Sequence, residues 1–122
     1  MMYTRRKFIR FPVSGSARVK VPEMKFSFQG ELEKLSHGGV GISTGVKVKT
    51  GTPVALEIQV SMGSDSPETS ITGVVRSFSS LGETGLLGIQ FDRTIDSDKE
   101  PHIYQFLSAL EKELITECRW IE

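Results

Sequence analysis

An alternation of apolar and polar residues over positions 14–91 constrains the fold of this chain more than any other feature. Successive side chains of a β-strand point to opposite faces, so a period of two predicts strands with one buried face. The pattern recurs in about six short runs separated by glycine, proline and serine, which is typical of an antiparallel sandwich or small barrel.

The expected strands each carry apolar residues at alternate positions. They cover residues 17–21, 25–33, 40–48, 54–60, 71–78 and 86–91, where 46–48 extends a short edge strand and Gly30 weakens or bulges the second run. Two polar connections, residues 61–70 and 79–85, lack a core-facing pattern and are predicted to be mobile loops.

After Phe91 the apolar period changes to three and four residues, which predicts an amphipathic helix over about 98–119. Its apolar stripe consists of Ile103, Phe106, Leu107, Leu110, Leu114, Cys118 and Ile121. Asp98 is expected to cap this helix and to place Pro101 in the first turn. The stripe is expected to pack on a barrel opening, and its end at Trp120 and Ile121 offers surface for a partner.

Charge is balanced over the chain but concentrated at its start. The 122 residues contain 15 Lys and Arg and 15 Asp and Glu, so no net field attracts a nucleic-acid polymer. However, Arg5, Arg6, Lys7 and Arg10 lie within six residues, and no acid occurs among the first 22. This arrangement favours a small anionic partner over a long polyanion.

The expected location is the cytoplasm. Cys118 is the only cysteine, so no intrachain disulfide is possible, and it is interpreted as a buried structural thiol. The first residues lack the apolar core of a signal peptide. The sequence contains no run of about 18 apolar residues, so no membrane insertion is expected.

The sequence does not predict an enzyme or a metal site. His37 and His102, the two histidines, have no second ligand at metal spacing. Ser36 has no nucleophile elbow around it. The aspartates before the helix lack the glycine and distal glutamate of a calcium loop, and the glycines after His37 lack the Lys-Ser/Thr of a phosphate loop.

Two short motifs carry binding chemistry. Arg6-x-x-x-Arg10 lies in an N-terminal segment, residues 1–12, which we call the arginine arm, and Ser36-x-x-Gly39 follows a strand-like run. Guanidinium groups grip phosphate oxygens and guanine edges bidentately, and glycine permits close approach of a bulky anion. The pair predicts a nucleotide clamp; the plainer interpretation is a basic tail and an ordinary glycine turn.

The order of these features resembles the PilZ family of cyclic di-GMP receptors. That family has Arg-x-x-x-Arg in an N-terminal arm and Asp/Asn-x-Ser-x-x-Gly about 20–30 residues later. The first motif precedes a six-stranded antiparallel β-barrel with a C-terminal helix, and the second belongs to that barrel. The segments 10–13, 35–42, 72–76 and 88–91 also resemble family strands, so the likeness spans essentially the whole chain.

The resemblance implies a mainly β fold, with a flexible arm over 1–12 and a single PilZ-type barrel plus helix over 13–122. It implies that Arg6 and Arg10 grip guanine and phosphate of cyclic di-GMP, and that Arg5 stacks within a self-intercalated ligand dimer. Ser36 would hydrogen-bond the ligand from the barrel surface, and Gly39 would hold the tight turn. Ordering of the arm would then provide the signal.

One position departs from the family pattern. Lys34 stands where the family has Asp or Asn, and lysine has donors but no acceptor for guanine N–H groups. Glu33 faces the other side of a regular strand and would substitute only if a bulge interrupted that strand. Loss of the acceptor predicts weakened binding, although Lys34 can reach a phosphate.

The sequence therefore predicts a non-enzymatic, bacterial, cytoplasmic receptor, monomeric or dimeric, whose arm reorganises on binding cyclic di-GMP. Its protein partner would belong to motility, pilus or polysaccharide (biofilm) machinery. The alternative is a degenerate PilZ-like adaptor that binds no nucleotide. A third interpretation, a small RNA-binding barrel, is disfavoured by the zero net charge and the lack of an aromatic platform.

Overall fold

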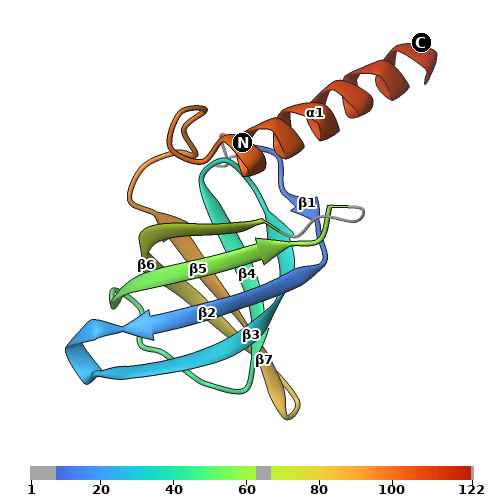
Figure 1. Ribbon diagram of the computed structural model, residues 1–122. Coiled ribbons are helices and arrows are strands. Elements are labelled where there is room, and N and C mark those ends of the chain that lie inside the picture. The colour runs from blue at the N-terminus through green and yellow to red at the C-terminus, as the bar shows by residue number, and fades with distance from the viewer. Residues whose placement is uncertain (1–7, 63–66, 122) are drawn as a thin grey trace.

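The structure is a computed structural model that describes residues 8–62 and 67–121 (Figure 1). Antiparallel strands joined by short connections are followed by one long helix. The elements are β1 (Phe11–Pro12), β2 (Gly15–Val21), the 3-10 turn η1 (Pro22–Met24), β3 (Phe26–Leu35), β4 (Gly39–Thr44), β5 (Pro53–Val60), β6 (Glu68–Leu81), β7 (Thr84–Phe91) and α1 (Pro101–Ile121).

The strands form a closed antiparallel barrel. Hydrogen-bonded neighbours follow the order β3-β2-β5-β6-β7-β4, and β4 pairs again with β3 to complete the ring. The two-residue β1 pairs with Lys34 and Leu35 at the end of β3. The predicted six-stranded antiparallel barrel with a C-terminal helix is thus confirmed. Closure removes the open edges that would otherwise expose unpaired backbone groups.

The barrel interior is filled by the apolar residues of the alternating pattern. On β2 and β5 every second side chain is buried, and the same alternation holds on β7. The side chains that are essentially inaccessible include Val19, Leu35, Ile42, Leu56, Ile58, Val60, Val75 and Leu87. This interior is a single packed core, as a narrow barrel requires.

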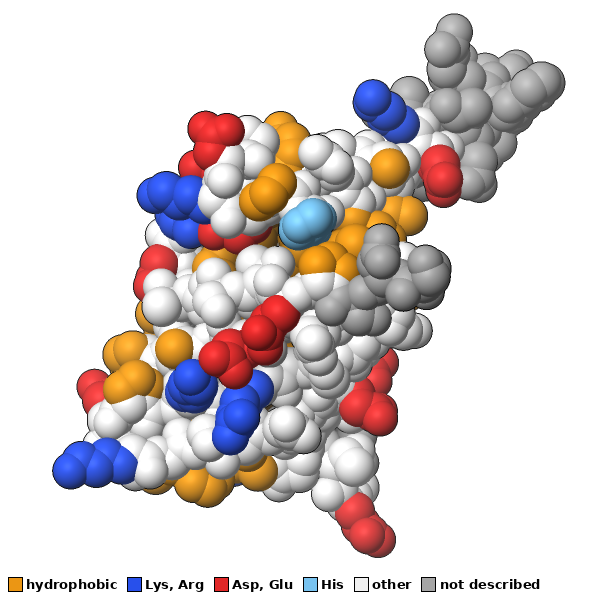
Figure 2. Space-filling model, viewed as in Figure 1, with side chains coloured by type: hydrophobic (Ala, Val, Ile, Leu, Met, Phe, Trp, Pro, Cys, Tyr) orange, Lys and Arg blue, Asp and Glu red, His pale blue; other side chains and the backbone are white. Residues whose placement is uncertain are grey.

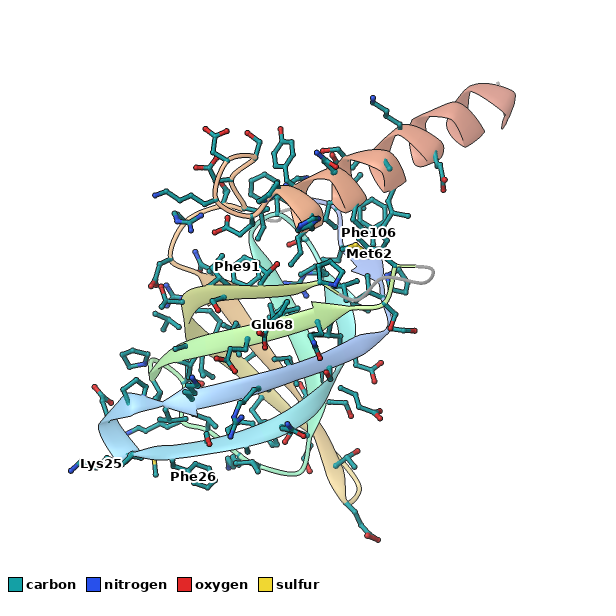
Figure 3. The ribbon with its side chains drawn as sticks, viewed as in Figure 1. Lys25, Phe26, Met62, Glu68, Phe91 and Phe106 are labelled. Carbon is teal, nitrogen blue, oxygen red and sulfur yellow. The ribbon has the colours of Figure 1, made fainter. Side chains whose placement is uncertain are left out.

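Helix α1 closes one end of the barrel. Ile103 and Leu107, one turn apart on its inner face, are both fully buried. Phe106 and Met62 pack against the core at the same end, whereas Lys25 and Phe26 lie at the opposite end (Figure 3). The last turns of α1 extend beyond the barrel (Figure 1). Ile103 and Leu107 of the predicted stripe therefore pack on an opening, as expected. The side chains of Leu114, Cys118, Trp120 and Ile121 lie outside the described residues.

Several local predictions were wrong. Residues 79–85 do not form a mobile loop, because β6 and β7 are joined by a two-residue turn at Gly82 and Glu83. Residues 68–70, predicted as loop, are the start of β6. The strand after the double glycine is no edge, since β4 pairs on both sides, and it ends at Thr44 before Val46 and Val48.

The start of α1 also differs from the prediction. The helix begins at Pro101, and the side chain that organises the preceding segment belongs to Glu100, which is 3% exposed. Its Oε1 accepts hydrogen bonds from Arg93 Nη1 (2.8 Å) and from the backbone N–H of Asp96 (2.9 Å). Asp98 instead donates its own N–H to Asp96 Oδ1 at 2.9 Å. The buried, charged side chain of Glu100 therefore sets the start of the helix. The hydrophobic periodicity of the sequence gives no sign of it.

The hydrogen bond from Arg93, assisted by the N–H of Asp96, holds the pKa of Glu100 below its ordinary value against the opposing effect of burial. A carboxyl whose pKa is lower in the folded than in the unfolded chain stabilises the fold fully above the unfolded pKa of about 4.3. That stabilisation is lost as the pH falls through the folded pKa.

Glu100→Gln should lower the free energy of unfolding at pH 7 by about 2 kcal/mol, because charge-assisted hydrogen bonds are lost. It should also flatten the decline in stability between neutral and acidic pH. Urea denaturation across this range, with exposed Glu23→Gln as the matched control, measures both effects. Equal stability of wild type and Glu100→Gln at pH 7 would contradict the anchoring role.

Candidate functional site

The 36–39 turn, which joins β3 to β4, is held by the hydroxyl of Ser36. Ser36 Oγ accepts hydrogen bonds from the backbone N–H groups of Gly38 and Gly39, both at 3.1 Å. The N–H of Ser36 donates to the carbonyl of Gly39 at 3.0 Å. Ser36 is 6% exposed, so its hydroxyl is directed into its own turn. The residue predicted to contact the ligand therefore shapes the turn.

Gly39 permits the turn to lie directly against β7. A Cβ at this position would lie 2.5 Å from the carbonyl oxygen of Ile89, which no side chain tolerates. The carbonyl of Gly38 accepts the N–H of Phe91 at 2.9 Å, which ties the turn to the end of the same strand. The predicted role of Gly39 in holding a tight turn agrees with this close approach.

The end of the arginine arm runs beside this turn. Phe11 pairs with Leu35 and Pro12 with Lys34, and the N–H of Val13 donates to the carbonyl of Glu33 at 3.1 Å. Because the pairing is antiparallel, the preceding Arg10 lies at the end of β3 where the 36–39 turn begins. The Arg10 side chain is exposed. Arg5 and Arg6, the other predicted arm residues, lie outside the described residues.

Phe8, between the two motif arginines, lies against the turn. Its ring centroid is 5.9 Å from that of His37. A Cβ on Gly38 would lie 2.9 Å from Phe8 Cδ2, so the missing side chain of Gly38 makes room for the ring. The arm thus contacts the turn at Phe8 and pairs with β3 through β1.

His37 connects the turn to α1. Its imidazole is largely buried and lies edge-on to Tyr104, with ring centroids 5.4 Å apart. His37 Nε2 is 3.4 Å from Glu111 Oε1, and the His37 carbonyl accepts the N–H of Ile95 at 2.8 Å. His37 therefore contacts the segment between β7 and α1 at Ile95 and the helix itself at Tyr104 and Glu111.

A bulge in β3 changes the positions of Glu33 and Lys34. Leu32 pairs with Ile42 of β4, but Lys34 pairs with Gly41, so the register shifts across Glu33. Leu32 and Leu35 are buried, and both intervening side chains are exposed. Glu33 consequently presents a carboxylate on the outer side of the barrel beside Lys34. The three-residue step from Leu32 to Leu35 is the signal in the sequence for this bulge.

No metal centre is evident in the part of the chain that the structure describes, and the face seen in Figure 2 carries no broad basic surface. Within 8–62 and 67–121, no three His, Cys, Asp or Glu side chains gather at a metal-binding distance. Cationic and anionic side chains alternate over the face seen in Figure 2. A pocket lined by Lys47, Val48, Lys49, Thr50 and Phe78 contains none of the motif residues. No described helix is long and apolar enough to cross a membrane.

Similarity to solved structures establishes the fold. The chain superposes on MotI/DgrA, the Inhibitor of motility of Bacillus subtilis, with a TM-score of 0.73 at 14% identity, covering 91% of this chain and 53% of that one. The PilZ domain of Escherichia coli YcgR with c-di-GMP gives 0.65 at 20% identity, covering 95% and 98%. The K. pneumonia MrkH–c-di-GMP complex gives 0.68 at 16% identity, covering 94% and 56%.

This chain spans about half the length of MotI and of MrkH, and nearly all of the YcgR PilZ domain. No curated protein sequence matches it. Among protein families, residues 4–109 match the PilZ domain, a stretch that includes both sequence motifs, the whole barrel and the first turns of α1. The chain belongs to the PilZ domain family.

Proposed function

We propose that this chain is a receptor for cyclic di-GMP, which binds where the arginine arm passes the 36–39 turn. The supporting observation is the β1–β3 register, which brings Arg10 to the start of that turn. The PilZ domain of YcgR and MrkH, similar in fold, have both been solved with c-di-GMP. An exposed guanidinium beside a compact glycine turn suits a ligand with two phosphates and two guanines.

Each motif residue has a separate role in this proposal. Arg6 and Arg10 bind a guanine edge and a phosphate, while Arg5 stacks on a base. Gly39 keeps the turn flat against β7. Ser36 accepts the N–H groups of Gly38 and Gly39 and so holds the turn in the shape that the ligand meets. Phe8 fixes the middle of the arm on the turn, which reduces the entropy lost when the ligand is gripped.

Glu33 supplies the acceptor that Lys34 cannot. The bulge places the Glu33 carboxylate on the outer side of β3, and its backbone carbonyl receives the N–H of Val13 from the end of the arm. A carboxylate here accepts guanine N1–H and N2–H, the pair of donors for which the family uses Asp or Asn. Lys34, beside it, is directed to a phosphate.

Binding signals through a partner protein, without catalysis. The arm reorganises over residues 3–12 and changes the surface that the barrel presents to a component of motility, pilus or polysaccharide machinery in the cytoplasm. The second candidate is an adaptor that binds no nucleotide. It is favoured by Lys34 and by the fold likeness to an inhibitor of motility.

Arg10→Ala should weaken cyclic di-GMP binding by about tenfold to a hundredfold, the loss expected for one bidentate arginine–guanine contact. Arg6→Ala/Arg10→Ala should abolish measurable binding. Isothermal calorimetry measures both, with Arg18→Ala, an exposed arginine on β2, as the matched control. Absence of heat from the wild type at high micromolar ligand would favour the adaptor, and binding that survives the double substitution would refute the site.

Glu33→Ala should weaken binding by about tenfold, because it leaves guanine donors without an acceptor. Adding Lys34→Asp to Glu33→Ala should restore affinity, and Lys34→Asp alone should raise it. Glu31→Ala, an exposed carboxylate on the same strand, is the control in the same titrations. Unchanged affinity in Glu33→Ala would show that the bulged carboxylate does not contact the ligand.

A further inference from the structure

His37 is the residue at which the arm, the 36–39 turn and α1 meet. Its ring contacts Phe8 of the arm and Tyr104 of α1, with centroid distances of 5.9 and 5.4 Å, inside the range of interacting aromatic pairs. Its Nε2 lies 3.4 Å from Glu111 Oε1, two turns further along the same helix. The sequence motifs explain none of these contacts, since His37 is an unspecified position between Ser36 and Gly39.

The ring has little freedom to move independently of either neighbour. His37 is 9% exposed, and its backbone lies in a turn held at both ends by hydrogen bonds to Ser36. Its carbonyl accepts the N–H of Ile95, a buried residue of the segment that precedes α1. Displacing the ring from Phe8 therefore disturbs its packing on Tyr104, and the reverse also holds.

Several hydrogen bonds hold the connection between β7 and α1. Asp92 Oδ2 accepts a hydrogen bond from Thr72 Oγ1 at 2.7 Å. Glu100, just before the helix, is held by Arg93 and by the N–H of Asp96. These bonds, together with the bond from the N–H of Ile95 to the carbonyl of His37, hold the connection in one shape, so we expect a change at His37 to act on the docking of α1.

We propose that His37 couples the arginine arm to α1, so that ligand occupancy and docking of α1 on the barrel stabilise each other. This inference rests on the proposed function, since the ligand acts through Arg10, two residues from Phe8. With Arg10 held by the ligand, Phe8 is kept on a ring that the docked helix holds in position. By linkage, the ligand strengthens helix docking by the same factor by which docking strengthens ligand binding. The docking of α1 on the barrel therefore depends on whether the ligand is bound.

The first test uses the full chain and cyclic di-GMP. Ligand should slow amide hydrogen exchange over residues 104–111 by about fivefold or more, and Tyr104→Ala should weaken binding by the same factor. Tyr104→Phe, which keeps the ring, should bind like wild type. Gln105→Ala, an exposed neighbour on α1, is the matched control. Normal affinity in Tyr104→Ala together with unchanged α1 exchange on binding would overturn the coupling and leave the receptor function intact.

The second test needs no nucleotide. Phe8→Ala should accelerate exchange over residues 104–111 in the ligand-free protein, and it should add nothing in a His37→Ala background. An effect of Phe8→Ala that persists without His37 would refute the route through this residue. If the wild type gives no heat with cyclic di-GMP, the receptor proposal fails. The exchange measurement on Phe8→Ala still tests whether His37 couples the arm to α1. Unchanged α1 exchange in Phe8→Ala overturns the coupling in either case.

Discussion

The pairing of β4 on both of its sides is the constraint on which the rest of the structure depends. Because β4 joins β3 to β7, the sheet closes, the inward side chains share one core, and an opening remains for α1 to cover. The same pairing fixes the turn that begins β4. Gly39 must lie against the carbonyl of Ile89, so the turn is compact, and His37 is directed toward the helix while Gly38 receives Phe8. The candidate site is therefore a consequence of barrel closure.

Periodicity predicted about six short antiparallel strands in a sandwich or a small barrel, and the resemblance to the PilZ family selected the barrel. Periodicity was sufficient for α1, whose inner face buries Ile103 and Leu107 as expected. It failed where a charge or a turn decides the outcome. The buried Glu100, bound by Arg93, sets the start of the helix, and the two-residue turn at Gly82 replaces an expected loop.

The two segments of the candidate site could be predicted from their motifs. The contacts between these segments could not. The spacing of Arg6 and Arg10 and of Ser36 and Gly39 marks the two segments, but only the β1–β3 register shows that they meet. The bulge at Glu33 was considered from the sequence as a condition for a substitute acceptor, and the structure contains that bulge. The contacts of His37 depend on α1 reaching back across the barrel end, which is a long-range arrangement that no local pattern encodes.

We propose that the arm and the 36–39 turn form one site for cyclic di-GMP. The most direct measurement is a nuclear magnetic resonance titration of the isotope-labelled full chain with this ligand. If they do, the largest amide shifts should fall on residues 8–13 and 33–39, with smaller shifts along 104–111 that disappear in His37→Ala. Shifts confined to the distant pocket at Lys47 and Thr50, or no shifts at saturating ligand, would contradict this proposal.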